Sequence, residues 1–129
     1  MQRILCIDGD EGFRRTLSGQ LAGEGFTVTA AASGAEGLAA SAAASFDLIF
    51  LDMDLPEPDG LPTYLALRAH PRTRQVPMIL CCAVAPKDHW DRLPYDTEGQ
   101  SFVMGRSEDV GLLLARITQL LAREITSLG

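Results

Sequence analysis

Basic residues are scarce in this sequence, and those present are scattered rather than clustered. The 129 residues include 11 Lys and Arg against 17 Asp and Glu, which gives a formal net charge of −6. Contacts with phosphates supply much of the affinity of proteins that bind nucleic acids. We therefore expect no direct binding of DNA or RNA by this domain.

Long apolar stretches are also absent. No run approaches the ~20 residues that a membrane-spanning helix needs. Residues 1–4 lead directly into a predicted strand, which leaves no room for a signal peptide. We expect no membrane contact and a cytoplasmic location.

Cysteine and histidine are too few to suggest a disulfide framework or a catalytic centre. Cys6, Cys81 and Cys82 all lie in apolar runs, and neighbouring residues 81 and 82 cannot both face the same side of a strand. Neither His70 nor His89 has a nearby nucleophile in the sequence. The sequence predicts structural thiols and gives the histidines no catalytic role.

A regular alternation of strand and helix patterns is present along the whole chain. Short apolar runs predict strands, and capping or periodic residues predict the helices between them. The predicted strands are 3–8, 26–31, 46–52, 76–82 and 100–104, and the predicted helices are 11–23, 34–45, 60–70 and one that begins after Ser107. The alternation favours one α/β domain over residues 1–129, with a parallel sheet covered on both faces.

Acidic residues stand at the ends of two predicted strands. Asp8 ends the first strand and Asp52 the third, and Asp10 and Asp54 each follow two residues later. In open parallel sheets the functional site lies beyond the carboxyl ends of the strands. Burying an unpartnered carboxylate costs several kcal/mol, so such residues usually have a cation or a chemical role. The alternative is that they cap helices, above all Asp10, which directly precedes one.

Three segments resemble the receiver domains of response regulators. The opening Ile4-Leu5-Cys6-Ile7-Asp8, with Asp10 and Phe13-Arg14, is similar to the start of those domains. Residues 46–61 (Phe-Asp-Leu-Ile-Phe-Leu-Asp-Met-Asp-Leu-Pro-Glu-Pro-Asp-Gly-Leu) resemble the family's phosphoacceptor strand and loop, and residues 67–77 its approach to the fourth strand. The resemblance implies a flavodoxin-like fold, with a five-stranded parallel sheet in the order 2-1-3-4-5 and helices on both faces.

The resemblance also implies a site. Asp52 is then the phosphoryl acceptor, Asp8 one carboxylate of an Mg²⁺ site, and Asp54 the residue whose backbone carbonyl faces the metal. Mg²⁺ prefers oxygen ligands, and it neutralises charge when a carboxylate attacks a phosphoryl group. The implied partners are proteins, either a histidine kinase or a downstream signalling protein.

Three aromatic residues fall at positions linked to signalling in that family. Phe102 fits the aromatic position that the family couples to a hydroxyl on the fourth strand. Trp90 and Tyr95 lie where receivers usually present their output surface, and two exposed rings there would suit a partner interface. The alternative for Trp90 and Tyr95 is that both rings cover the core.

Three positions depart from the family pattern. Gly9 stands in place of a second acid, Cys82 in place of Thr or Ser, and Gly105 in place of a lysine. A thiol is a weak hydrogen-bond donor and glycine supplies no charge, so we expect weakened Mg²⁺ binding and phosphoryl transfer. Asp10 and Arg106 are conceivable replacements for the missing acid and lysine, but strand parity and the chemistry of Arg argue against both.

Three functions follow from these residues. The first is an atypical receiver with lost or impaired phosphorylation that acts through protein contacts, and the second is a working phosphoacceptor that uses Asp52 and Mg²⁺. The third is a small phosphatase, because Leu51-Asp52-Met53-Asp54 resembles the Asp-x-Asp of haloacid-dehalogenase-type enzymes. Those enzymes carry the motif on their first strand with a lysine further on, so we expect the first function and no enzyme. The chain can be the N-terminal part of a longer protein.

Overall fold

The computed structural model describes most of the chain, namely residues 2–55, 60–82, 101–105 and, between 111 and 121, residues 111, 113–115, 117–119 and 121. For residues 82 and 102–105 it describes the backbone alone. Trp90, Tyr95 and Arg106 lie outside the described residues, so the output-surface prediction is not tested by the structure.

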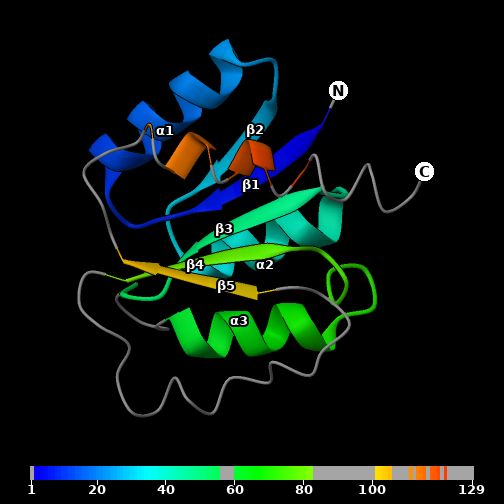
Figure 1. Ribbon diagram of the computed structural model, residues 1–129. Coiled ribbons are helices and arrows are strands. Elements are labelled where there is room, and N and C mark those ends of the chain that lie inside the picture. Colours follow the sequence, from blue (N-terminus) through cyan, green and yellow to red (C-terminus); the bar gives the residue numbers. More distant parts are fainter. Residues whose placement is uncertain are drawn as a thin grey trace.

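Strands and helices alternate from residue 3 to residue 82, and a last strand follows at residues 101–105 (Figure 1). All strand pairs are parallel, and the sheet order is β2-β1-β3-β4-β5. The flavodoxin-like parallel arrangement expected from the sequence is therefore confirmed. The elements are β1 (Arg3–Ile7), α1 (Glu11–Gly23), β2 (Thr27–Ala31), α2 (Gly34–Ala43), β3 (Leu48–Asp52), α3 (Gly60–Ala69), β4 (Met78–Cys82) and β5 (Ser101–Gly105).

The central strands are buried on both faces because alternate residues belong to two separate cores. On one face, Leu5, Ile49 and Leu80 pack in a cluster that includes Tyr64 and Leu67 of α3, with α2 residues against it. On the other face, the cluster combines side chains of the sheet, of α1 and of the helical residues 113–121: Cys6, Phe50, Ile79, Leu17, Leu21, Leu113, Ile117 and Leu121. Such two-sided cover explains why β3 reads as a continuous apolar run.

Helices α1 and α2 begin at side-chain caps. Asp10 accepts a hydrogen bond from the backbone N–H of Phe13 at 3.2 Å, and Ser33 accepts one from that of Glu36 at 3.2 Å. The Glu36 carboxylate in turn accepts from the N–H of Ala32 at 2.7 Å. Reciprocal bonds of this kind satisfy N–H groups that a helix start otherwise leaves unpaired. The predicted capping role of Ser33 is confirmed.

Two predicted strands begin two residues later in the structure than the apolar runs suggested. β3 begins at Leu48 rather than residue 46, since Phe46 packs in the core ahead of the strand. β4 begins at Met78 rather than residue 76, because Pro77 has no N–H with which to pair. Pro77 contributes only its carbonyl, which accepts from Ile49 N–H at 3.0 Å. Neither shift moves the carboxyl end of its strand.

Candidate acidic site

The two aspartates at the strand ends lie side by side. β1 and β3 pair with Ile7 opposite Leu51, so the next residues, Asp8 and Asp52, face each other across adjacent strands. Neighbouring strands are about 4.8 Å apart. Asp8 is 1% exposed and Asp52 4% exposed. The predicted meeting of these two carboxylates at the edge of the sheet is thus present, and both are buried.

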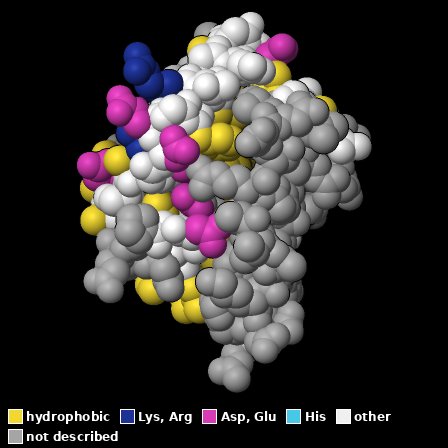
Figure 2. All heavy atoms as spheres, turned by 90° about the vertical axis from the view of Figure 1, so that its left-hand side faces the viewer, with side chains coloured by type: hydrophobic (Ala, Val, Ile, Leu, Met, Phe, Trp, Pro, Cys, Tyr) yellow, Lys and Arg dark blue, Asp and Glu magenta, His cyan; other side chains and the backbone are white. Residues whose placement is uncertain are grey.

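Each carboxylate is held by the backbone two residues further on. Asp8 Oδ1 accepts from the N–H of Asp10 at 2.8 Å, and Asp52 Oδ1 accepts from the N–H of Asp54 at 2.9 Å. This local turn is one that aspartate forms readily after a strand. The same geometry at both strand ends aims the two carboxylates toward a common region. Figure 2, seen from the left-hand side of Figure 1, shows Asp and Glu side chains gathered on this face of the molecule.

Asp10 and Asp54 play different parts from the buried pair. Both are exposed, and Asp10 is the N-cap of α1. The capping role considered for Asp10 in the sequence is therefore the one that the structure gives it. Asp54 follows Met53 at the start of the loop, and a role of its backbone carbonyl toward a metal stays a prediction.

A glycine shapes the loop that follows Asp52. A methyl group added at Gly60 would lie 2.3 Å from the Cα of Met53 and 2.9 Å from the carbonyl oxygen of Asp52. Real Cβ atoms do not approach backbone so closely, so only glycine lets the start of α3 lie against the acidic strand end. This close packing explains the glycine of the Asp-Gly pair noted in the sequence.

Two buried cysteines lie on the strands next to the carboxylate pair. Cys81 is the register partner of Asp52 on β4, and Cys6 lies two residues before Asp8 on the same face of β1. Both are buried and neither forms a disulfide, in agreement with the structural thiols expected from the sequence. Burial raises the pKa of the Cys6 thiol to about 12, and the negative charges of Asp8 and Asp52 add to the shift while Arg14 opposes it. Among the described residues, Asp8 and Asp52 thus act on this thiol as negative charges and Arg14 as an opposing positive charge.

Arg14 is the site residue that sequence reasoning did not single out. Its guanidinium Nη1 donates to the backbone carbonyl of Asp8 at 2.8 Å, and the side chain is half-buried. The sequence shows Phe13-Arg14 only as part of a family likeness. Its position could have indicated the contact. Arg14 lies in the first turn of α1, four residues after Asp10, and a long side chain there reaches back to the strand end.

The three departures from the family pattern occupy the ends of their strands. Gly9 is exposed directly after Asp8, and the backbones of Cys82 and Gly105 are register partners at the ends of β4 and β5. The side chains of Cys82 and Phe102 lie outside the described residues. Within the part of the chain that the structure describes, no group of three or more His, Cys, Asp or Glu side chains could hold a metal ion.

The carboxylate pair fits a divalent cation only in part. Mg²⁺ prefers six oxygen ligands in a near-octahedral arrangement and keeps several waters when few carboxylates are offered. Asp8 and Asp52 provide two carboxylates, while Asp10 is engaged at the helix and Gly9 offers none. The described side chains thus supply part of the oxygen ligands that Mg²⁺ prefers.

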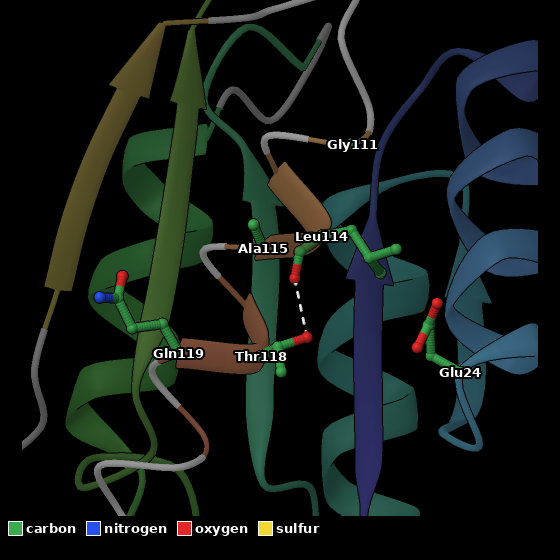
Figure 3. Close-up of a pocket in the computed structure, with 6 residues that line it drawn as sticks. All are labelled: Glu24, Gly111, Leu114, Ala115, Thr118 and Gln119. Carbon is green, nitrogen blue, oxygen red and sulfur yellow. Dashed lines mark hydrogen bonds between the residues drawn. The ribbon is translucent and has the colours of Figure 1, made fainter.

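A separate hollow lies between α1 and the helical residues 111–119 (Figure 3). Its volume is about 640 Å³. Glu24, just after α1, faces this helical segment across it, and neither Asp8 nor Asp52 contributes to its walls. The lining residues are Glu24, Gly111, Leu114, Ala115, Thr118 and Gln119. The hollow is therefore distinct from the acidic site.

No helix of the described residues is long and apolar enough to cross a membrane.

Comparison with known proteins gives one consistent result. The model of the response regulator receiver domain matches residues 4–94. The DNA-binding dual master transcriptional regulator RpaA of Synechocystis is 32% identical over 95% of this chain and 50% of its own length. The chain spans about half or less of the length of the curated relatives it matches.

Solved structures agree on the fold. A CheY-like receiver domain protein from Methanospirillum hungatei has a TM-score of 0.84 at 23% identity, and the match covers 98% of both chains. The response regulator TrrA of Thermotoga maritima, solved in complex with Mg²⁺-BeF, has a TM-score of 0.76 at 25% identity, over 93% of this chain and 99% of that one. From the acidic strand ends, the sheet order and these matches together, the chain belongs to the response regulator receiver domains of two-component signalling.

Proposed function

We propose that this chain is an atypical receiver in which phosphorylation of Asp52 is impaired and which signals through contacts with protein partners. The observation that carries the proposal is the composition of the strand ends: two buried carboxylates are retained, while the positions of a second acid and a lysine are Gly9 and Gly105. The partners would be a histidine kinase or a downstream signalling protein.

The electrostatics of the site support impaired transfer. A phosphoryl group carries negative charge, and it must approach two carboxylates that are already negative. Proteins promote phosphoryl transfer mainly by positioning and by stabilising that charge with cations. Two unit charges 4 Å apart interact by about 4 kcal/mol at an effective dielectric constant of ~20, so each missing charge is a large loss.

Asp10 does not supply the missing acid in this arrangement. Its carboxylate caps α1 through Phe13 N–H, and removing a cap of this kind costs a helix about 1 kcal/mol. A move of Asp10 toward a metal ion would give up that bond. This cost adds to the case for weak metal binding.

A working phosphoacceptor is the second candidate. The adjacent, buried Asp8 and Asp52 favour it, as does the likeness to TrrA, which was solved with Mg²⁺-BeF. Under this alternative Asp52 is phosphorylated and Mg²⁺ binds between the two strand ends. A small Asp-dependent phosphatase would need a lysine at a strand end, and the described strand ends have none. We propose that the chain is not an enzyme.

The test is phosphorylation by acetyl phosphate with Mg²⁺, read by intact mass. We expect little adduct on the wild-type protein and none on Asp52→Ala. The double variant G9D/G105K restores the acid and the lysine, and we expect it to gain adduct at least about tenfold, since each restored charge contributes to binding the metal and the phosphoryl group.

Two other outcomes of this experiment would contradict the proposal. Stoichiometric adduct on the wild-type protein that disappears in Asp52→Ala would establish the phosphoacceptor and contradict impaired phosphorylation. A double variant that folds but gains nothing would show that the two glycines are not the cause.

We also propose where the domain works and what it does not bind. We propose that residues 1–129 form one domain, that it works in the cytoplasm, and that it contacts neither nucleic acid nor membrane itself. The relatives' length leaves room for an output domain in the natural protein, and RpaA is named as DNA-binding. Any such activity would belong to another part of the protein.

A further inference from the structure

Helices α2 and α3 carry apolar side chains on their outer surfaces. The exposed side chains of α3 are all apolar, and those of α2 are alanines apart from one acid; together they are Pro62, Leu65, Ala66, Ala69, Ala35, Glu36, Ala39, Ala42 and Ala43. We call this surface the α2–α3 face. Leu65, in the middle of α3, is 45% exposed. A helix that faces only water normally has charged or polar residues on its outer side, so this face has the composition of a covered surface.

Helix α1 of the same domain has the ordinary pattern. Its Leu17 and Leu21 belong to the core, while Glu11, Arg15 and Gln20 are exposed. This helix thus separates an apolar side from a polar side, as a helix that borders water does. The apolar outer surface of α2 and α3 is therefore a local property of one side of the molecule.

The two apolar helices lie next to each other and run in the same direction. Both pack on one core cluster, to which α3 contributes Tyr64 and Leu67, and α2 contacts α3 directly. Each helix starts after the carboxyl end of one strand and ends before the next parallel strand begins. A helix of 10 residues is about 15 Å long, so the face is small for a protein interface.

Opposite charges stand at the two ends of this face. Glu36 is exposed in the first turn of α2, and Asp54 is exposed in the chain before α3. Arg72 and Arg74 are exposed beyond the other end of α3, and Arg72 Nη1 donates to the carbonyl of Ala42 near the end of α2 at 3.2 Å. The face therefore has an apolar centre, an acidic end and a basic end.

We propose that the α2–α3 face is the interface of a weak homodimer, in which a second copy of this chain packs on it about a twofold axis that crosses the helices. Such an axis brings the same patch of both copies together with their helices antiparallel. The basic end of each copy then meets the acidic end of the other, and the apolar side chains around Leu65 are covered. An axis along the helices would instead set Arg72 against Arg72, which is unfavourable.

The proposed dimer goes beyond the proposed function and does not depend on whether Asp52 is phosphorylated. A second copy suits this face because one surface supplies both the apolar contact and the two complementary charges. Interfaces commonly combine an apolar centre with a charged rim in this way. Because the face is small, we expect a dissociation constant of about 100 µM.

Sedimentation velocity at increasing protein concentration tests the dimer. We expect the mean mass of the wild-type protein to rise toward that of a dimer by about 0.5 mM. Leu65→Glu places a charge in the apolar centre, so its dissociation constant should rise at least about tenfold. Gln20→Glu adds the same charge to α1, and we expect a constant within about twofold of wild type.

Two results of this measurement would overturn the inference. A wild-type protein that stays monomeric at about 0.5 mM would mean that a different partner, or none, covers the face. A dimer that Leu65→Glu and Gln20→Glu affect equally would form through another surface. Thermal melts followed by circular dichroism confirm that each variant is folded.

Engineered cysteines test the orientation of the two copies. Ala35 and Ala43 are exposed at opposite ends of α2, and Ala39 is exposed between them. Under mild oxidation we expect a linked dimer from Ala39→Cys alone and from a mixture of Ala35→Cys with Ala43→Cys, because only these pairs come within reach of a disulfide in the antiparallel arrangement. The wild-type protein, oxidised in the same way, gives the background. Linkage of Ala35→Cys alone as readily as of the mixture would contradict the antiparallel dimer.

Discussion

Cys6 reports the electrostatic character of the acidic site at the scale of one residue. The thiol is fully buried in the core that joins α1 to the sheet, and its pKa is raised to about 12 from an ordinary value of 9.0. Burial is the largest cause, and the carboxylates of Asp8 and Asp52 add to it. In the unfolded chain the same thiol would lose its proton near pH 9.

This difference predicts how stability changes with pH. The contribution of Cys6 is fully present below pH 9, and it is lost between pH 9 and about 12, because there the unfolded state releases a proton that the folded state keeps. From pH 8 to 10 the free energy of unfolding should fall by about 1.4 kcal/mol more in the wild-type protein than in Cys6→Ala. Urea denaturation at the two pH values measures the difference, and equal falls in both proteins would contradict the shift.

At the scale of elements, a buried arginine joins α3 to the amino ends of β4 and β5. Arg68 is 6% exposed, and its Nη1 donates to the carbonyls of Val76 at 2.6 Å and Arg74 at 3.1 Å. Nη2 donates to Ser101 Oγ at 2.8 Å, and the guanidinium lies 5.5 Å from the ring centre of Tyr64. The network therefore ties the first residue of β5 to α3, at the edge of the sheet opposite the acidic site.

Ser101 is the shared member of this network, which allows a quantitative test. Its hydroxyl also lies 2.7 Å from the Tyr64 hydroxyl. We expect Tyr64→Phe and Ser101→Ala each to lower the free energy of unfolding by about 1 kcal/mol, and the double variant to lose less than the sum. Urea denaturation measures the cycle.

Thr118→Ala is the control, since the carbonyl of Leu114 accepts the hydrogen bond of the Thr118 hydroxyl within the same exposed helical turn. We expect its effect to stay within about 0.5 kcal/mol. Strictly additive losses at Tyr64 and Ser101 would show that the two hydroxyls do not act together.

At the scale of the whole molecule, charge argues against a nucleic-acid role for this domain by itself. The net charge is −6, and the face beyond the strand ends carries a group of acidic side chains (Figure 2). We expect the isolated chain to bind duplex DNA with a dissociation constant weaker than about 100 µM, even at 50 mM salt. Fluorescence anisotropy with a labelled duplex tests this, and salt-dependent micromolar binding would be the contrary result.

The sequence was most informative where one local pattern determines structure. The apolar runs that end at Asp8 and Asp52 predicted both the strands and the meeting of the two carboxylates, because parallel strands bring their carboxyl ends to one edge. The capping box at Ser33 and the glycine at residue 60 were also visible as short motifs.

Features that depend on long side chains were not predicted. Arg14 and Arg68 look like ordinary helix-surface residues in the sequence, and their roles arise from backbone carbonyls that only the folded chain brings within reach. Helix periodicity describes which face is apolar, but it does not say where a guanidinium will find acceptors. The strand starts at residues 46 and 76 were misjudged for a similar reason, since apolar character continues beyond the paired backbone.

The cap formed by Asp10 has a consequence for how this domain could change over time. Because that carboxylate already caps α1, a mutation that recruits it elsewhere would weaken a helix that packs on one face of the sheet. An acid acquired at residue 9 would add a carboxylate next to Asp8 without giving up the bond to Phe13 N–H, whereas redirecting Asp10 would lose that bond.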